Sequence, residues 1–246
     1  MERPVYLVRR ALFACALTAL VVISGAQPAL ASAPKVLEGM DVSHHNDPID
    51  WAKAKAAGIR FVFAKATESG DFVDPSYAHN KQQVEALGLS FGAYHFAQPD
   101  GAAGDAPAEA DHFVDTAALT GKDLVPVLDL EVSGGLGQRK LIAWAKSWLA
   151  EVHARLGVKA TIYTTPSFWA QHMGNTTWFA TNGYRLWVAH WTEAGKPTVA
   201  ASNWGGRGWT FWQYDNCGAV DGSTGCVDRD RYNGTGLAAL KIKNNR

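Results

Sequence analysis

The sequence predicts an α/β fold, a modified TIM-like barrel that begins as alternating strand and helix units and closes with antiparallel strands. Short apolar runs rich in β-branched and aromatic residues alternate with longer amphipathic stretches, a pattern typical of parallel sheets and barrels. After Thr164 the helical stripes become short or disappear. We therefore expect the last strands to pair without helices between them.

The apolar runs predict seven strands, and four amphipathic stretches between the early runs predict helices. Gly58, Gly88 and Gly157 directly follow three of those stretches, where glycine is the usual C-cap. Residues 166–173 have room only for a short helix, and residues 193–208 show no helical stripe. The expected strands are 37–42, 60–66, 90–96, 124–131, 160–164, 186–191 and 209–214, and the expected helices are 49–57, 75–87, about 105–118 and 138–156.

Residues 1–31 are predicted to be a secretory signal peptide. Arg9 and Arg10 precede an apolar run of about 13 residues, and small residues follow at 29–31. A membrane anchor is the weaker interpretation, because a spanning helix needs roughly 20 apolar residues. Residues 32–246 are long enough for one undivided barrel, so we expect a single catalytic domain with a core over about 37–240. The expected location is secreted, extracellular.

The charge balance bears on the choice of partner. The chain carries 23 lysines and arginines against 23 aspartates and glutamates, a formal net charge of zero. No stretch is rich in basic residues, so neither nucleic acid nor, after signal cleavage, a membrane is expected as a partner. We expect a monomer that needs no cofactor.

Cys217 and Cys226 remain as a pair once Cys15 leaves with the signal peptide. Oxidation is the default outside the cell, so the two residues are expected to form a disulfide. Closing so short a loop contributes roughly 2–3 kcal/mol in the chain-entropy model. A thiolate nucleophile and a metal-binding pair are the alternatives, but the glycines between the cysteines favour a stapled turn.

Polar and aromatic residues stand at the C-terminal end of nearly every apolar run. In barrels of parallel strands these ends meet at one mouth, which is where active sites lie. We therefore expect one cleft built from the ends of several strands. The residues at these ends are Asp41, Lys65, Thr67, Glu68, Tyr94, His95, Asp129, Glu131, Tyr163, His190, Trp191, Gln213 and Tyr214.

Asp129 and Glu131 are two residues apart on a predicted strand, so both side chains emerge on one face, with Cα atoms roughly 6.5–7 Å apart. Neighbouring carboxylates resist being ionised together, which keeps one protonated near neutral pH. Such a pair is what hydrolysis of a glycosidic bond requires. We assign Glu131 as the acid because its longer side chain stands at the strand's tip. A helix cap at Asp129 and a rim charge at Glu131 are the alternatives, yet a buried strand rarely carries unneeded charge.

Three other features bear on the chemistry of this mouth. Asp41 lies close to His44 and His45, which makes a metal site an alternative. Adjacent histidines on a strand point to opposite faces and no His-x-His spacing supports them, so no metal is expected. Asp228 either returns a further carboxylate to the mouth or pairs with a neighbouring arginine. Trp191, at a strand end, is placed to stack on a sugar ring.

Seven motifs follow one another along the chain and together form a specific pattern. They are 39–44 (Gly-Met-Asp-Val-Ser-His), 65–68 (Lys-Ala-Thr-Glu), 92–96 (Gly-Ala-Tyr-His-Phe), 128–131 (Leu-Asp-Leu-Glu), 162–164 (Ile-Tyr-Thr), 212–214 (Trp-Gln-Tyr) and 227–228 (Val-Asp). In this order and spacing they resemble the glycoside hydrolase family 25 lysozymes, also called Chalaropsis-type muramidases. The resemblance runs from Gly39 to about Tyr232.

The resemblance implies hydrolysis of the β-1,4 bond from N-acetylmuramic acid to N-acetylglucosamine in peptidoglycan, on a (β/α)5(β)3 barrel. It implies Glu131 as general acid and Asp129 as either the nucleophile or the orienter of the substrate's 2-acetamido group. Asp41 and Asp228 would be further catalytic carboxylates. The expected substrate contacts are Tyr94, Tyr163, Trp191, Glu68, Gln213 and Tyr214.

Four positions depart from the family's usual pattern: His45, Ser69, Asp230 and Tyr232. None of them touches the Asp-x-Glu pair, so the departures concern the preference for particular sugars. Two other functions stay open, a chitinase-like glycosidase and a non-catalytic barrel that binds cell-wall glycan. The binding barrel would keep the aromatic platforms and lack the acid, so the presence of both carboxyl groups argues against it.

Overall fold

A computed structural model describes residues 1–2, 36–46 and 48–243 of the chain. The chain divides into two units, Met1–Ala33 and Pro34–Arg246. The predicted signal peptide lies almost wholly outside the described residues, and so does its cleavage point. Among the residues described, no helix is both long enough and apolar enough to cross a membrane.

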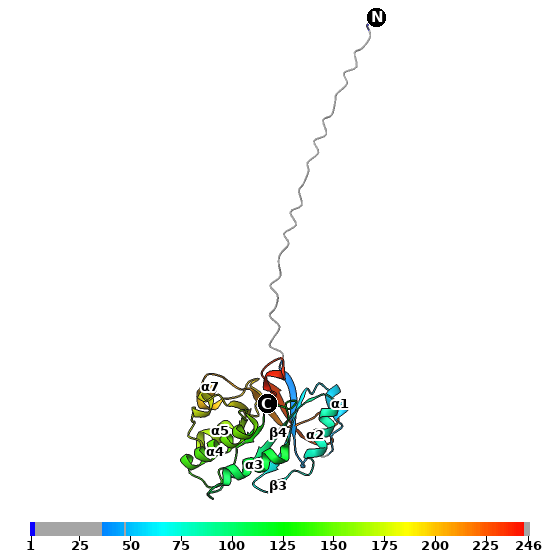
Figure 1. Ribbon diagram of the computed structural model, residues 1–246. Coiled ribbons are helices and arrows are strands. Elements are labelled where there is room, and N and C mark those ends of the chain that lie inside the picture. Colours follow the sequence, from blue (N-terminus) through cyan, green and yellow to red (C-terminus); the bar gives the residue numbers. More distant parts are fainter. Residues whose placement is uncertain (3–35, 47, 244–246) are drawn as a thin grey trace. The chain divides into compact units, whose positions relative to one another are not determined.

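Eight strands of the second unit form a closed barrel (Figure 1). Around the ring they run β1, β2, β4, β5, β6, β7, β8 and β9, and β9 pairs with β1 to close it. Neighbours from β1 to β8 are parallel, whereas β9 is antiparallel to both β8 and β1. A short strand, β3, pairs with the end of β2. The bounds are β1 Leu37–Val42, β2 Phe61–Glu68, β3 Phe72–Val73, β4 Ser90–Phe96, β5 Val127–Asp129, β6 Thr161–Thr164, β7 Arg185–Ala189, β8 Phe211–Gly218 and β9 Val227–Tyr232.

Helices connect successive strands around the barrel (Figure 1). Helix α5 begins with Pro166 after Thr165, whose side chain accepts a hydrogen bond from the Phe168 amide at 3.1 Å. Helix α4 ends at Gly157, which adopts the left-handed conformation with φ 70°. The helices are α1 Trp51–Ala56, α2 Tyr77–Ala86, α3 Asp105–Ala117, α4 Gln138–Leu156, α5 Pro166–His172, α6 Trp178–Thr181 and α7 Ala200–Gly205, followed by a 3-10 helix at Leu237–Leu240.

The predicted α/β barrel is confirmed, and its antiparallel closure is confined to one strand, β9. The expectation that the last strands pair without helices was wrong between β6 and β7, which α5 and α6 connect. These helices have 7 and 4 residues, too few to show a periodic stripe. Helix α7 was also not expected; its residues Ala201 to Trp204 have φ between 50° and 55°, a left-handed turn that right-handed periodicity does not detect.

Large apolar side chains fill the barrel interior. A Cβ atom at Gly39 would lie 2.3 Å from the ring of Phe61, and one at Gly92 would lie 2.3 Å from the ring of Phe63. Glycine at these two inward positions therefore makes room for two phenylalanine rings. The buried residues of this interior cluster are Phe61, Phe63, Leu124, Val127, Tyr163, Trp187, Ala189, Phe211, Leu237 and Leu240.

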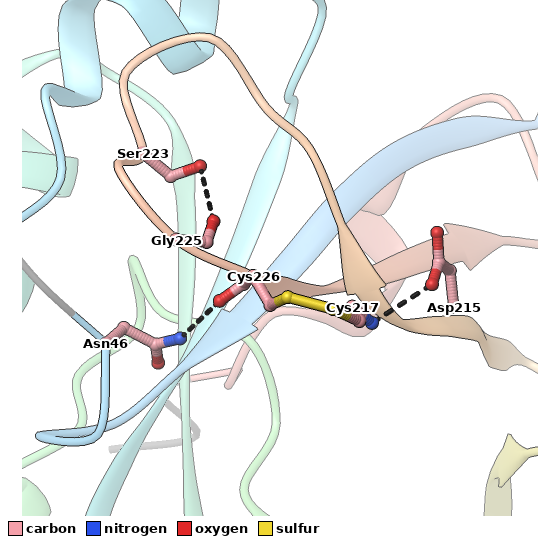
Figure 2. The surroundings of a disulfide bond; sticks show 6 residues. All are labelled: Asn46, Asp215, Cys217, Ser223, Gly225 and Cys226. Atoms are coloured by element: carbon pink, nitrogen blue, oxygen red, sulfur yellow. Dashed lines mark hydrogen bonds between the residues drawn. A yellow bond between two sulfur atoms is a disulfide. The ribbon is translucent and has the colours of Figure 1, made fainter.

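The predicted disulfide joins Cys217, in β8, to Cys226, directly before β9 (Figure 2). The two Cα atoms lie 4.3 Å apart, so the bond ties the two strands of the closing hairpin together. Asn46 Nδ2 donates a hydrogen bond to the carbonyl oxygen of Cys226 at 3.2 Å. The loop after β1 is thereby attached to the hairpin that carries the disulfide.

Candidate active site

A cleft of about 490 Å³ opens at the C-terminal ends of the barrel strands. This is the end at which barrels of parallel strands carry their active sites. Eight of the predicted site residues line the cleft: Asp41, Glu68, Tyr94, Asp129, Glu131, Tyr163, Gln213 and Asp228. The other lining residues are Ser43, His45, Asn46, Lys65, Phe96, Gln98 and Trp187.

Asp129 and Glu131 lie at the end of β5. Asp129 is the last residue of the strand and is 7% exposed, whereas Glu131 is exposed at the mouth of the cleft. Leu130 between them is fully buried away from the cleft, because successive side chains of an extended chain alternate. Asp129 Oδ1 has no hydrogen-bond partner among the described residues. The structure thus brings the two carboxyl groups together at the end of the strand, with Asp129 the more deeply buried of the two.

The pKa of both carboxyl groups is raised. For Asp129 burial is the largest cause, and repulsion from Glu131 and Asp41 adds to it. For Glu131 the surrounding protein withdraws the carboxyl from bulk water and raises its pKa, while Lys65 lowers it. A pair that shares one negative charge keeps a proton at higher pH than an isolated carboxyl does, which is the state that a general acid needs.

Asp41, Asp228 and Asp230 form a second group of carboxyl groups on neighbouring strands. Asp41 of β1 lies opposite Asp228 of β9 in the antiparallel ladder. Asp230 is fully buried, and Trp187 Nε1 donates a hydrogen bond to its Oδ1 at 2.8 Å. Burial raises the pKa of all three, and repulsion among them raises it further, to about 8 for Asp228. This group therefore retains protons near neutral pH.

Gln213 connects the second group to the aromatic residues of the cleft. Its Nε2 donates to Asp41 Oδ2 at 2.8 Å, and its Oε1 accepts from Tyr163 OH at 2.9 Å and from Trp191 Nε1 at 3.1 Å. Because the tryptophan can only donate, the orientation of the amide is fixed. Burial and nearby carboxylates raise the pKa of Tyr163 and Tyr94 well above the usual value, so both remain neutral hydroxyl donors.

Lys65 is the one lysine or arginine among the described residues that line the cleft. Its Nζ forms an ion pair with Glu68 Oε2 and lies 4.7 Å from the centre of the Phe96 ring. Gln98 Nε2 donates to the other oxygen of Glu68 at 3.0 Å. Burial opposes ionisation of Glu68, but the hydrogen bonds from Lys65 and Gln98 outweigh it and lower its pKa. Glu68 is therefore an ionised carboxylate at the cleft wall.

Trp191 and Tyr214 lie outside the cleft lining. Trp191 is 52% exposed and stands at the rim, attached to Gln213 through its indole nitrogen. Tyr214 follows Gln213 on β8, so its side chain faces the other side of the strand, and its hydroxyl donates to Glu38 Oε2 at 2.8 Å. The structure thus ties Trp191 to the cleft residue Gln213 and turns the Tyr214 hydroxyl toward Glu38, and the expected contact of each with substrate stays a prediction.

His44 and His45 are the histidines that the sequence offers as alternative metal ligands. His44 Nδ1 forms a hydrogen bond with Asp74 Oδ2 at 2.7 Å, and its ring lies 4.0 Å from that of His45, which lines the cleft. Within residues 36–46 and 48–243, no three His, Cys, Asp or Glu side chains are arranged to hold a metal ion.

Gln98, Trp187 and Asp230 belong to the site or contact it but were not predicted as site residues. Asp230 is two residues beyond Asp228, a spacing that places both on one face of a strand. The charged segment Val227–Tyr232 lacks the apolar alternation of a strand, so its sequence does not indicate that the two carboxyl groups share a face. Gln98 lies in a loop without periodicity, and Trp187 stands inside an apolar run where core packing is the ordinary role.

Residues 40–223 match the family model described as glycosyl hydrolases family 25. The chain belongs to this family. Lysozyme M1 of Streptomyces globisporus is 36% identical over 218 residues, which cover 85% of this chain and 72% of that protein. The N,O-diacetylmuramidase of Chalaropsis sp is 31% identical over 204 residues, which cover 78% of this chain and 94% of that protein.

Solved family 25 structures have the same fold. The bacterial lysozyme from Streptomyces coelicolor superposes with a TM-score of 0.78 at 34% identity, covering 85% of this chain and 98% of that one. The family GH25 lysozyme from Aspergillus fumigatus superposes with a TM-score of 0.76 at 26% identity, covering 85% and 100%. The predictions of a glycoside hydrolase of the family 25 lysozyme type and of a TIM-like barrel are confirmed.

Proposed function

We propose that this family 25 enzyme is a muramidase that hydrolyses the β-1,4 bond between N-acetylmuramic acid and N-acetylglucosamine in peptidoglycan. The observation that carries the proposal is the exposed Glu131 beside the buried Asp129, both with a raised pKa. The relatives named lysozyme and N,O-diacetylmuramidase support peptidoglycan glycan strands as the substrate.

Glu131 is the proposed general acid. Its protonated carboxyl gives a proton to the glycosidic oxygen as the bond to the anomeric carbon breaks, so the leaving sugar departs as an alcohol. The raised pKa supplies that proton near neutrality. In the second step the Glu131 carboxylate takes a proton from the water that attacks the anomeric carbon, which restores the acid.

Asp129 acts on the anomeric centre in one of two ways. As a nucleophile it forms an ester with the anomeric carbon; as an orienter it holds the N–H of the 2-acetamido group while the carbonyl oxygen of that group attacks. Its Oδ1, unpartnered among the described residues, is available for either role. An ester of Asp129 recovered from rapidly denatured enzyme would identify the first route, and tight binding of a cyclised acetamido analogue the second.

The remaining cleft residues are proposed to bind and orient the sugars. Asp41 and Asp228 lie beside the reacting pair as further carboxyl groups of the catalytic machinery. Tyr94 and Tyr163 present neutral hydroxyls to the cleft, and Trp191 offers an exposed ring at the rim for stacking. Glu68 and Gln213 complete the proposed contacts.

We also propose that the enzyme acts outside the cell, as a monomer with a single catalytic domain, after removal of residues 1–31. The disulfide between Cys217 and Cys226 supports an oxidising compartment. The balance of 23 basic and 23 acidic residues gives no reason to propose a nucleic-acid or membrane partner.

Mass analysis of the products tests the bond that is cut. Peptidoglycan is digested with the purified enzyme, reduced with borohydride and analysed, and every new reduced end is expected on muramic acid. Reduced ends on glucosamine would contradict the proposal. Cleavage of chitin oligomers at a comparable rate would favour the chitinase-like alternative, and binding of glycan without any new ends would favour the binding barrel.

A further inference from the structure

Gln98 lies next to the proposed catalytic pair but has no role in the mechanism above. It lines the cleft and follows β4 by two residues. The amide of the preceding residue, Ala97, donates to the Asp129 carbonyl oxygen at 2.9 Å. On the other side, a Cβ atom at Gly134 would lie 1.5 Å from the carbonyl oxygen of Pro99. The loop that carries Gln98 is therefore packed directly against the segment that carries Asp129 and Glu131.

The side-chain amide of Gln98 has a defined orientation. The atom that faces the Glu68 carboxylate at 3.0 Å must be Nε2, because a carboxylate only accepts hydrogen bonds. Glu68 is in turn held by its ion pair with Lys65. This leaves one N–H of the Gln98 amide available, and its Oε1 accepts no hydrogen bond from the described residues. Gln98 thus offers a donor and an acceptor side by side.

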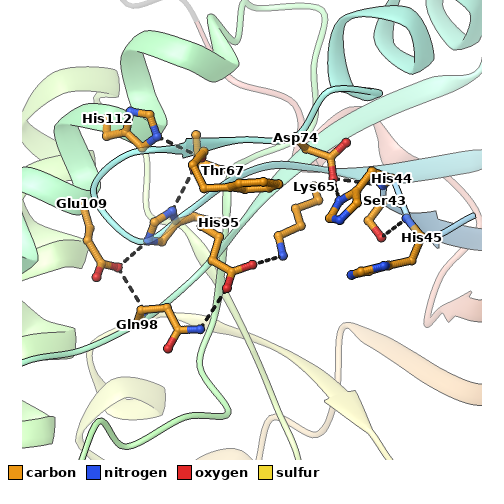
Figure 3. A network of polar contacts seen from close by, with 12 residues as sticks. Ser43, His44, His45, Lys65, Thr67, Asp74, His95, Gln98, Glu109 and His112 are labelled. Atoms are coloured by element: carbon orange, nitrogen blue, oxygen red, sulfur yellow. Dashed lines mark hydrogen bonds and ion pairs between the residues drawn. The ribbon is translucent and has the colours of Figure 1, made fainter.

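A buried polar network behind the cleft holds the Gln98 backbone (Figure 3). Glu109 Oε2, from α3, accepts from the Gln98 amide at 3.2 Å and is hydrogen-bonded to His95 Nε2 at 2.7 Å. Thr67 Oγ1 and His95 Nδ1 are hydrogen-bonded at 2.8 Å, and the His95 ring stacks on Trp148. Burial lowers the pKa of His95 to about 3, so the ring is neutral, and burial raises the pKa of Glu109 to about 7. The mechanism above uses none of Glu109, His95 and Thr67.

We propose that Gln98 is a specificity-determining residue that binds an amide group of the substrate, and that Glu109 is the residue that positions it. An amide side chain with one free N–H and one free carbonyl matches the C=O and N–H of another amide. Peptidoglycan offers such groups in two places, the 2-acetamido groups of the sugars and the stem peptides. The inference rests on the proposed function, because it concerns the same cleft and the same substrate.

Binding is measured in a Glu131→Gln background, so that turnover does not interfere. The ligands are soluble glycan strands in three forms: intact, freed of stem peptides, and both freed of peptides and de-N-acetylated. Gln98→Ala is expected to weaken binding of intact strands about five- to tenfold, the loss of one or two neutral hydrogen bonds. Gln82→Ala, at an exposed position of α2, is the matched control and is expected to leave every dissociation constant unchanged.

The three ligands identify the source of the amide. If the sugars supply it, the effect of Gln98→Ala persists on peptide-free strands and disappears on de-N-acetylated ones. If the stem peptides supply it, the effect is already absent on peptide-free strands. Equal binding by Gln98→Ala and its parent on intact strands, or an effect that persists on strands lacking both kinds of amide, would overturn the inference.

A double-mutant cycle tests the positioning role of Glu109. Glu109→Leu should weaken binding of intact strands as much as Gln98→Ala does, and the double variant should be no weaker than either single variant. Glu109→Gln keeps an accepting oxygen and should restore binding. If the losses of the two single variants add up in the folded double variant, the positioning role of Glu109 is refuted. If Glu109→Leu does not fold, the inference still requires that Glu109→Gln binds as tightly as its parent and that Gln98→Ala binds more weakly. If the wild-type enzyme, which keeps Glu131, releases no new reducing ends on muramic acid, that result contradicts the proposed function and not the role of Gln98.

Discussion

Trp187 donates a hydrogen bond from its indole nitrogen to Asp230 Oδ1 at 2.8 Å inside the barrel. The other oxygen, Asp230 Oδ2, has no hydrogen-bond partner among the described residues. No lysine or arginine pairs with this carboxyl in the described residues. Burial raises the pKa of Asp230 well above 3.8, so the folded protein keeps this group protonated.

Asp230→Asn should therefore alter how stability depends on pH. Because the folded pKa lies above the unfolded one, the stability that the protonated group contributes is complete below about pH 4 and is lost as pH rises toward the folded pKa. Asparagine keeps an oxygen that accepts from Trp187 Nε1, and it does not titrate. Thermal unfolding should give equal Tm values near pH 4 and a Tm for the variant higher by about 2–4 °C at pH 8. The exposed Asp71→Asn is the control, and parallel curves for Asp230→Asn and wild type would contradict the account.

Lys65 lowers the pKa of both Glu131 and Asp129, although burial raises each of them more. Lys65→Met removes this opposing charge and leaves Glu68 without its ion pair. The pKa of Glu131 should then rise, and since the acid must be protonated, the alkaline limb of kcat/KM should move to higher pH by roughly 0.5–1 unit. The pH profile of kcat/KM on glycan strands checks this.

Two further variants separate this electrostatic effect from general loss of charge. Lys146, which lies over the ring of Trp178, is away from the cleft, and Lys146→Met should leave the alkaline limb in place. The double variant Lys65→Met/Glu68→Gln removes a cation and an anion together and should return the limb toward that of wild type. A shift to lower pH in Lys65→Met would refute the proposed role of its charge.

Gly39 is required by the Phe61 ring. A methyl group at Gly39 would overlap the ring, so Gly39→Ala should lower the free energy of unfolding by about 1–3 kcal/mol. At Gly137, where φ is −68°, an added Cβ atom would have no other atom within 4 Å. Gly137→Ala should therefore change the free energy of unfolding by less than about 1 kcal/mol. Urea unfolding compares the two. Equal effects would mean that the interior packing does not select glycine at position 39.

Much of the fold was predictable because local pattern and position agree. Nearly every parallel strand from β1 to β8 is an apolar run with polar or aromatic residues at or next to its C-terminal end, so both the barrel and the common mouth follow from the sequence. Strand β9 breaks the rule because two of its residues, Asp228 and Asp230, carry carboxyl groups toward the interior. An alternation of acidic and basic residues does not predict a strand by itself. The reason for the two acids, a site inside the barrel mouth, becomes visible only in the folded structure.

The candidate site was predictable to a similar extent. Asp129 and Glu131 could be paired from spacing alone, because side chains two residues apart share a face. The same alternation places Tyr214 on the face of β8 opposite to its neighbour Gln213, which lines the cleft, and it could have been applied from the sequence. Gln98 could not be found in this way, since its position depends on contacts with Glu109, a residue of another element.

The assignment of Glu131 as the general acid is tested most directly by changing the leaving group of the substrate. On glycan strands, Glu131→Gln should lower kcat/KM by about 10²–10⁴, because the departing alcohol needs a proton. On an aryl glycoside whose leaving group departs without protonation, the same variant should lose less than about tenfold. Asp129→Asn should lose activity on both substrates. Equal losses by Glu131→Gln on both substrates, or full activity of that variant on glycan strands, would contradict the assignment.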